Sequence, residues 1–434
     1  MEKLAIDGPT QLSGTVEISG AKNAALPMMA ASLAIGEPVT LRRIPELLDV
    51  RTMIALLQSH GAEVKFAEDL GTLRIDASAI WNLVASEQWV TQMRAGICVL
   101  GPLLARFGTA RVALPGGCRI GHRPVDLHLR GLAALGADLR IDRGYIVAEA
   151  GRLQGTELSL LGPHGSSVTA TTNVLAAAVL AQGRTVIHGA AREPEVVDLG
   201  RFLQQAGAKI DGLGSSVIEV HGVEQLQAVD YRVCPDRIEA ATFAIAAAAT
   251  SGRISICGVV PDHLRAITDC LQSMGCDIQI GADSVQIAAN DPLRPRDVVA
   301  EPFPGIPTDT QAQLLTLLCL LPGESTVTDN VFPDRFQHVD ELSRLGASIR
   351  RFGNRALIRG GNRLSGASVV ASDLRASAAL VIAGLVADGT TQVRHIHHLD
   401  RGYERLEMKL NALGAQVQRC EDEWWQHPVT AEAV

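Results

Sequence analysis

Residues 48–62 read LDVRTMIALLQSHGA, a two-faced helical pattern that ends at Gly61 and leads into a strand. The same ending, a helix followed by glycine, a small residue and a strand, recurs with glycines at 136, 207, 275, 346 and 414. Glycine suits the left-handed residue that commonly follows a helix. Six copies about 70 residues apart predict a chain built from repeated units.

Each unit carries the same order of elements. A helix of small apolar residues (21–35 in the first copy) and a β-branched strand (38–44) precede the two-faced helix. Two further strands, at 63–69 and 70–77, close the unit, which reads β-α-β-α-β-β. The first helix is apolar nearly all round and must be buried, which one unit cannot achieve alone. We therefore expect an α/β fold in which three units share a core, giving two domains.

The domain boundary is expected where the third unit ends, around residues 233–237. An N-terminal strand within residues 3–18 precedes the first buried helix and is expected to complete the far domain, so that the chain crosses between domains twice. The predicted domains are 22–234 and 1–21 plus 235–418, with 419–434 as a C-terminal tail, partly disordered. Ligands commonly bind between domains, so the crossing is the expected location of a site.

Composition excludes several classes of function. Aromatic residues make up 3% of the 434 residues, which disfavours a base-stacking nucleic-acid binder. The net charge of −8 disfavours DNA and anionic membranes as partners. The eight cysteines form no CxxC or Cys/His metal-binding pattern, and we expect no metal, no cofactor and no obligate protein partner. No signal-peptide pattern or long apolar run is present, so a cytoplasmic protein with reduced thiols is expected.

Two segments of the first half carry candidate chemistry. Residues 19–23, SGAKN, resemble a helix start with Ser19 or Gly20 as capping types and Lys22 in the first turn. A lysine there opposes the helix dipole, so Lys22 is either solvated or part of an anion site. Residues 114–128 form a loop with three glycines, in which Cys118 lies near two arginines. Such a thiol leans toward thiolate and suits a nucleophile or proton donor, although a cysteine in a turn is often inert.

The second half offers a carboxylate and several arginines. In residues 303–311, FPGIPTDTQ, Thr308 looks like a helix cap and Asp309 like an early helical residue, which is favourable capping chemistry or a general base. Arginines recur at related points of the units, some of them at the starts of buried helices: Arg94, Arg237, Arg335, Arg375 and Arg401. Any one of these arginines, taken alone, is typical of a solvated surface residue. Several arginines that lie together indicate a binding site for a strongly anionic ligand.

These strings together resemble the enolpyruvyl transferases over residues 1–418, through ISGAKNAALP, LPGGCRIGHRPVDLH, AAREPEVVD, GIPTDTQAQ, VFPDRFQHVDELSRLGA, DLRASAALVIAG and HLDRGYERLE. The resemblance implies a two-domain inside-out α/β barrel. It also implies transfer of the enolpyruvyl group of phosphoenolpyruvate to the 3′-hydroxyl of UDP-N-acetylglucosamine, with release of phosphate, in peptidoglycan synthesis.

The resemblance also implies roles for individual residues. Lys22, Arg123 and Arg401 would bind phosphoenolpyruvate, with Asn23 beside them. Cys118 would donate a proton, form a covalent adduct and react with fosfomycin, and Asp309 would deprotonate the sugar hydroxyl. The expected UDP-sugar contacts are Arg94, Arg123, Pro124, Val125, Asp126, Leu127, Ser167, Val168 and Val331, and the further cleft residues are Arg335, Asp373 and Arg375.

Four positions depart from the family's usual residues. Leu48 and Gly165 stand where lysines are common, Thr169 where glycine is common, and Cys98 where a relative has tryptophan. They leave open a paralogous transferase with another nucleotide acceptor. The shikimate-pathway relative is disfavoured by the string RPVDLH at 123–128. A non-catalytic UDP-sugar sensor is the alternative of another class, and the retained catalytic residues argue against it.

Overall fold

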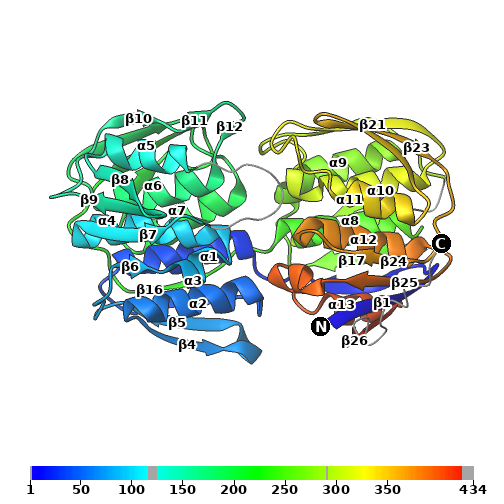
Figure 1. Ribbon diagram of the computed structural model, residues 1–434, viewed down its shortest axis with the longest axis horizontal. Helices are drawn as coiled ribbons and strands as arrows, with labels where there is room; N and C mark the ends of the chain where they lie inside the picture. Colours follow the sequence, from blue (N-terminus) through cyan, green and yellow to red (C-terminus); the bar gives the residue numbers. More distant parts are fainter. Residues whose placement is uncertain (1, 116–124, 290–291, 423–434) are drawn as a thin grey trace, which may run out of the picture.

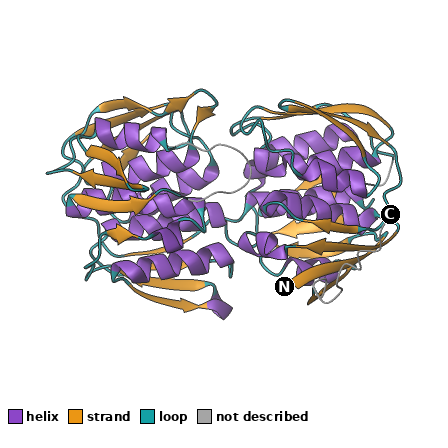
Figure 2. Cartoon of the chain, viewed as in Figure 1, coloured by secondary structure: helices purple, strands orange, loops and turns teal. Residues whose placement is uncertain are grey.

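The computed structural model describes residues 2–115, 125–289 and 292–422. It forms two lobes, the first made by the blue-to-green half of the chain and the second mostly by the half that runs from green through yellow to red (Figure 1). The N-terminal strand β1 (Glu2–Gly8) lies in the second lobe, next to the last strands of the chain. In each lobe the strands lie on the outside and the helices inside (Figure 2).

The six repeated glycines confirm the repeat. Their φ angles lie between 92° and 115°, in the left-handed region where glycine is favoured. Each closes its helix in the same way. At the first, the Gly61 amide donates to the Gln58 carbonyl at 2.9 Å and the Ala62 amide donates to the Leu57 carbonyl at 3.1 Å. The same two bonds recur at the other five glycines, so the sequence repeat is a repeat of structure.

Each unit contains one four-stranded sheet. In spatial order, the first two strands of the sheet pair in parallel and the other neighbouring strands pair antiparallel. The sheets, in spatial order, are β16 (Val229–Arg232), β3 (Val39–Arg42), β5 (Thr72–Asp76), β4 (Glu63–Ala67); β6 (Val84–Ala85), β7 (Thr109–Ala113), β9 (Tyr145–Glu149), β8 (Asp138–Asp142); β10 (Glu157–Ser159), β13 (Arg184–His188), β15 (Val217–His221), β14 (Lys209–Asp211); β2 (Ser13–Glu17), β17 (Arg253–Cys257), β19 (Ser284–Ala288), β18 (Asp277–Ile280); β20 (Val298–Ala300), β21 (Gly323–Asp329), β23 (Arg355–Gly360), β22 (Ser348–Phe352); and β24 (Ser368–Val370), β25 (Gly389–Arg394), β1, β26 (Gln416–Glu421). A small pair, β11 (Leu161–Gly162) and β12 (Gly165–Ser166), projects from the third unit.

The helices form an inner and an outer set. The inner helices are α1 (Lys22–Ala31), α4 (Leu100–Phe107), α6 (Val168–Ala178), α8 (Arg237–Ala249), α10 (Gln311–Leu320) and α12 (Leu374–Val386). The outer helices are α2 (Leu48–His60), α5 (Asp126–Ala134), α7 (Pro194–Gln205), α9 (Arg265–Met274), α11 (His338–Arg344) and α13 (Leu406–Ala412). Short turns complete the set: α3 (Glu87–Val90), η1 (Ser32–Ala34), η2 (Glu68–Leu70), η3 (Arg94–Val99), η4 (Pro261–Leu264), η5 (Thr308–Thr310) and η6 (Ile396–Arg401).

The inner helices are buried almost all round, as the sequence predicts. In α12 every residue except Val386 is buried. Small side chains let these helices approach closely: a Cβ added at Gly101 of α4 would collide with the Asn173 carbonyl oxygen of α6. The low aromatic content therefore matches a core of closely packed small residues.

Two hydrophobic cores divide the chain. One collects buried residues between Ala21 and Val233, and the other collects residues of Leu4–Ile18 together with residues of Ala240–Val417. These cores support the proposed domains 22–234 and 1–21 plus 235–418. The end of the second domain needs correction, because β26 continues to Glu421 and pairs with β1. Residues 419–421 are therefore part of a sheet rather than a tail, and 423–434 lie outside the described residues.

The chain crosses between the lobes twice, at residues 18–21 and 233–236. Here the Ala21 amide donates to the Cys234 carbonyl at 2.8 Å, and the Asp236 amide donates to the Ser19 carbonyl at 2.9 Å. The expected N-terminal strand is two strands: β1 completes the sixth sheet and β2 the fourth. Within the described residues, no helix is long and apolar enough to cross a membrane.

Candidate active site

Asp49, near the start of α2, joins residues from the two lobes. Its Oδ2 accepts a hydrogen bond from Lys22 Nζ at 2.9 Å, and its Oδ1 accepts one from Arg401 Nε at 2.8 Å. Lys22 begins α1 in the first lobe, whereas Arg401 ends η6 in the second. One carboxylate thus holds two cations whose positions in the chain are far apart.

The start of α1 explains why Lys22 can take part in such a site. The helix has Ala21 at its N-cap position and no side-chain capping bond, so the expected capping by Ser19 or Gly20 is wrong. The Ser19 hydroxyl donates to Glu404 Oε2 at 2.5 Å instead. Lys22 is buried rather than solvated. A buried ammonium at a positive helix end requires an anion, which here is Asp49.

The surroundings of Asp49 favour its charged form. Burial alone would raise its pKa, but the charges and hydrogen bonds of Lys22 and Arg401 outweigh burial and hold the pKa below its ordinary value. The cluster therefore carries one carboxylate against two cations. Its excess positive charge suits an anion with several charged oxygens.

A second cluster surrounds Asp309, which lies in η5 just before α10. Arg335 Nη1 donates to Asp309 Oδ1 at 2.6 Å, and Arg375 Nη2 donates to Asp309 Oδ2 at 2.9 Å. Both arginine side chains are buried, whereas 24% of the Asp309 side chain is exposed. The carboxylate thus reaches the surface while the two guanidinium groups hold it from behind.

These arginines decide what Asp309 can do chemically. Burial opposes ionisation, but Arg375 and Arg335 together hold the pKa of Asp309 far below its usual range. With both arginines in contact, Asp309 is a weak base.

The expected capping role of Thr308 is wrong. Pro307 occupies the cap position of η5, and no side-chain capping bond is made. The Thr308 hydroxyl donates to Asp329 Oδ2 at 2.6 Å and accepts from Arg335 Nη1 at 3.2 Å, so it bonds to side chains and not to a helix amide. Asp329 Oδ1 also accepts from the Val331 amide at 2.9 Å, which fixes the turn that carries this expected sugar contact.

Asp373 supports the same cluster from the start of α12. Its carboxylate caps the helix and accepts from the Arg375 amide at 2.9 Å and the Ala376 amide at 3.2 Å. The Arg375 guanidinium lies over the Tyr403 ring, 5.3 Å from its centroid. The structure therefore brings together Asp309, Arg335, Arg375 and, through the cap, Asp373.

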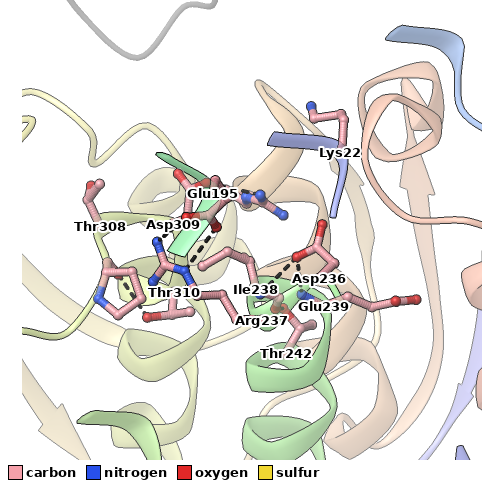
Figure 3. A network of polar contacts seen from close by, with 12 residues as sticks. Lys22, Glu195, Asp236, Arg237, Ile238, Glu239, Thr242, Thr308, Asp309 and Thr310 are labelled. Carbon is pink, nitrogen blue, oxygen red and sulfur yellow. Dashed lines mark hydrogen bonds and ion pairs between the residues drawn. The ribbon is translucent and has the colours of Figure 1, made fainter. Parts of the chain in front are cut away.

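A third charged pair lies between the lobes. Arg237, at the start of α8, donates to Glu195 of α7 from Nε at 2.9 Å and from Nη2 at 3.2 Å. Figure 3 shows this pair next to Asp309, with Lys22 in the same region. Charge interactions with Glu195, Glu193 and Asp309 outweigh the opposing effect of burial and raise the pKa of Arg237. Arg237 therefore stays charged between carboxylates of both lobes.

The remaining expected substrate contacts lie near helix starts of the first lobe. Asn23 follows Lys22 in α1, Arg94 begins η3, and Val125, Asp126 and Leu127 surround the start of α5. The Ser167 hydroxyl accepts from the Ala170 amide at 3.3 Å and caps α6, whose first residue is Val168. Cys118, Arg123 and Pro124 lie outside the described residues.

The four departures from the family pattern have distinct environments. Leu48 is 43% exposed at the start of α2. Gly165 has a φ of 94°, and an added Cβ would lie 3.4 Å from Cγ of Pro302 in the other lobe. The hydroxyl of Thr169 lies 3.2 Å from His128 Nε2. Cys98 is buried with its Sγ 4.0 Å from the Thr172 hydroxyl.

The buried cysteines are poorly suited to nucleophilic chemistry. Burial raises the pKa of Cys98, Cys270 and Cys276 to about 11 and that of Cys319 to about 12. Such groups are neutral thiols at physiological pH and weak nucleophiles. Cys420, expected in the tail, lies in β26.

Sequence reasoning missed Asp49, Glu193 and Glu195 as members of the site. Asp49 and Glu195 stand in the first turns of outer helices, where acidic residues are commonplace. Glu195 contacts Arg237, which is 42 positions away, and Asp49 contacts Arg401, which is 352 positions away. The neighbouring sequence therefore does not reveal either contact. The only available signal was the string AAREPEVVD at 190–198, with two closely spaced glutamates.

Comparison with known proteins settles the family. The profile of the family described as EPSP synthase (3-phosphoshikimate 1-carboxyvinyltransferase) matches residues 6–410. The chain belongs to this enolpyruvyl transferase family. The UDP-N-acetylglucosamine 1-carboxyvinyltransferase 2 of Carboxydothermus hydrogenoformans is 50% identical to it over 424 residues, which cover 97% of this chain and 100% of that relative. The UDP-N-acetylglucosamine 1-carboxyvinyltransferase of Methylacidiphilum infernorum is 48% identical over 419 residues, 96% of this chain and 99% of that relative.

Solved enolpyruvyl transferases have the same fold. The enolpyruvyl transferase NikO from Streptomyces tendae superposes with a TM-score of 0.87 at 26% identity, covering 96% of this chain and 98% of that one. An EPSP synthase from Acinetobacter baumannii superposes with a TM-score of 0.72 at 17% identity, covering 97% and 100% of the two chains. The expected fold of six units in an inside-out α/β barrel is confirmed.

Proposed function

We propose that this enolpyruvyl transferase transfers the enolpyruvyl group of phosphoenolpyruvate to the 3′-hydroxyl of UDP-N-acetylglucosamine and releases phosphate. The reaction would commit the sugar to peptidoglycan synthesis in the cytoplasm. The observation that carries the proposal is the meeting of Lys22 and Arg401, from opposite lobes, on Asp49. The names of relatives at 48–50% identity support the choice of acceptor.

The cation cluster suits phosphoenolpyruvate. The substrate carries a phosphate and a carboxylate, and removing these charges from water requires cations placed in advance. Lys22 and Arg401 would supply two of them, and Arg123 would supply the third. Substrate anions would replace Asp49 as their partner, so that the two lobes hold one ligand between them.

The proposed chemistry is addition followed by elimination. In the addition, the sugar 3′-oxygen attacks C2 of phosphoenolpyruvate, Asp309 accepts the hydroxyl proton, and Cys118 donates a proton to C3. In the elimination, C3 loses a proton and phosphate leaves C2, which restores the double bond in the product. The Asp309 carboxylate and the cations of both lobes thus act on one tetrahedral intermediate.

The depressed pKa of Asp309 fits a base that is activated by the substrate. While Arg335 and Arg375 both contact the carboxylate, it holds a proton poorly. A substrate diphosphate or phosphate that takes over part of either arginine would raise the pKa of Asp309. The group would then become basic when the acceptor is in place.

A second candidate is the same reaction on another nucleotide acceptor. It is favoured by Leu48, Gly165 and Thr169 and by the similarity to the enolpyruvyl transferase NikO, whose name specifies no acceptor. Purified protein with phosphoenolpyruvate and a panel of UDP-sugars and nucleotides would be assayed for phosphate release. We expect release with UDP-N-acetylglucosamine. Release only with another nucleotide would establish the second candidate, and binding without release would establish a non-catalytic sensor.

A further inference from the structure

The segment that leads to Asp309 contacts the opposite lobe at two points, Glu193 and Gly165. The Phe303 amide donates to Glu193 Oε1 of the first lobe at 3.4 Å, and the Phe303 ring centroid lies 5.6 Å from Cζ of Arg237, which belongs to the same lobe as Phe303 and pairs with Glu195 of the first. Pro302 faces Gly165 of β12, since a methyl group placed on Gly165 would lie 3.4 Å from Cγ of Pro302. Phe303 is therefore the residue of this segment with contacts to both a glutamate and an arginine of the boundary.

The partners of Phe303 are themselves fixed. Arg237 and Glu195 form a two-point ion pair in which 10% and 5% of the side chains are exposed. Paired guanidinium and carboxylate planes of this kind have a defined orientation. Glu193 is buried beside them, and burial raises its pKa. The start of α7 in the first lobe thus supplies a rigid surface for Phe303.

The backbone between Phe303 and Asp309 is rigid, so that the position of Phe303 determines the position of Asp309. Pro304 and Pro307 restrict its backbone, and the Gly305 amide donates to the Pro302 carbonyl at 2.9 Å. The Glu301 amide donates to the Ile306 carbonyl at 2.9 Å, and the Thr310 amide donates to the Pro307 carbonyl at 2.9 Å. A displacement of Phe303 would therefore move Asp309.

We propose that Phe303, held by the Arg237–Glu195 pair and by Glu193, is a positioning residue that sets Asp309 against the first lobe. The inference rests on the proposed function, because it assigns Phe303 a role through the base of that reaction. It predicts that the contact matters for the chemical step and not for binding of phosphoenolpyruvate, whose expected cations Lys22 and Arg401 belong to the Asp49 cluster.

The test compares Phe303→Leu with Phe303→Tyr in the full-length protein. Leucine keeps an apolar side chain but removes the ring over Arg237, and tyrosine keeps the ring. Because a misplacement of about 1 Å can reduce rate about 100-fold, we expect kcat of Phe303→Leu to fall between about 10-fold and 100-fold. The KM for phosphoenolpyruvate should stay within about twofold, and Phe303→Tyr should retain wild-type kcat.

Two controls separate positioning from loss of folded protein. Calorimetric titration with UDP-N-acetylglucosamine counts the competent sites in each variant, so kcat is expressed per site. Glu219→Gln breaks the exposed Arg184–Glu219 pair between β13 and β15, far in sequence from Asp309, and should leave kcat unchanged. Glu195→Gln is a second variant at the boundary and should reproduce the loss in kcat.

The outcomes are distinguishable. Wild-type kcat per site in Phe303→Leu would overturn the positioning role, and so would an equal loss in Phe303→Tyr. A loss expressed only as a higher KM for phosphoenolpyruvate would also overturn it. Absence of turnover in the wild-type protein would instead contradict the proposed function itself.

Discussion

Asp49 shows how a single residue can organise a site built from two lobes. Its carboxylate lies between Lys22 and Arg401 and lets two buried or half-buried cations approach each other. The Asp309 carboxylate does the same for Arg335 and Arg375. In both clusters a carboxylate stabilises two cations, and under the proposed function an anionic substrate would take its place.

Asp49→Asn tests the first cluster. Removing one partner of a buried ion pair typically costs about 3–5 kcal/mol, and we expect a loss of this size in the free energy of unfolding. Phosphoenolpyruvate should stabilise the variant more than the wild-type protein, because its anions replace the lost charge. Urea unfolding with and without phosphoenolpyruvate measures both effects.

The matched control is Asp230→Asn. Asp230 pairs with Arg42 at 2.6 Å, but about half of each side chain is exposed. Exposed pairs contribute about 0–1 kcal/mol, so this variant should lose little. Equal losses in the two variants would contradict the assigned importance of burial at Asp49.

His338 gives a prediction for pH. Burial lowers the pKa of this imidazole, at the start of α11, to about 4. In the unfolded chain its pKa is about 6.5, so the unfolded state binds the proton first as the pH falls. The contribution of His338 to the free energy of unfolding is therefore fully present above about pH 6.5 and is lost as the pH falls to about 4. Below that pH, His338 causes no further change.

Urea unfolding between pH 7 and pH 4 measures this dependence. We expect His338 to account for a decrease on the order of 1–3 kcal/mol in the free energy of unfolding over that range. The His338→Gln variant should show a correspondingly smaller decrease. An identical pH dependence in the variant and the wild-type protein would show that His338 is not its source.

At the scale of elements, the repeat was predictable because glycine has a specific conformational role. A residue with positive φ follows each outer helix, so glycine recurs at regular intervals along the sequence. The buried helices were predictable for a similar reason, since few sequences are apolar on all faces. The hydrogen bonds of Ser19 and Thr308 were not predictable, because their hydroxyls donate to Glu404 and Asp329, which are distant in sequence.

Gly207→Ala and Gly61→Ala separate backbone strain from crowding. A Cβ at Gly207 meets nothing within 4 Å, so its cost is that of a positive φ alone, about 1–2 kcal/mol. A Cβ at Gly61 would also collide with Cδ1 of Trp81. We expect the larger loss of thermal stability in Gly61→Ala, because the added Cβ would also lie 3.1 Å from the Ala79 carbonyl oxygen. Equal losses in the two variants would contradict a contribution from crowding at Gly61.

Arg419 connects the last strand to the site. Its guanidinium donates to Asp400, Glu407 and Glu2, and Asp400 immediately precedes Arg401. We expect Arg419→Gln to loosen η6 and to raise the KM for phosphoenolpyruvate about tenfold.

The control is Arg359→Gln, which breaks the exposed pair with Glu324. Steady-state kinetics of both variants decide whether Arg419 supports Arg401.

On the scale of the whole molecule, the two crossings put the N-terminal segment in the second lobe. β1 and β2 complete sheets of the second lobe, whereas β16 completes the sheet of the first unit within the first lobe. The paired crossings bring Lys22 and Arg237, which begin helices directly after them, to the boundary between the lobes. Composition and repeats were sufficient to predict this architecture, whereas the pairing of side chains across the boundary depends on contacts that only the folded chain creates.

The central claim is that residues from both lobes form one phosphoenolpyruvate site. The most direct measurement is phosphate release with UDP-N-acetylglucosamine, comparing kcat/KM for phosphoenolpyruvate in wild-type protein, Lys22→Gln, Arg401→Gln and the double variant. Truncating one partner of a buried charge contact typically costs about 2–5 kcal/mol, so we predict losses of about 30-fold or more in each single variant. The double variant should lose less than the product of the two, because the cations act on one ligand. Wild-type kcat/KM in either single variant would contradict a shared site.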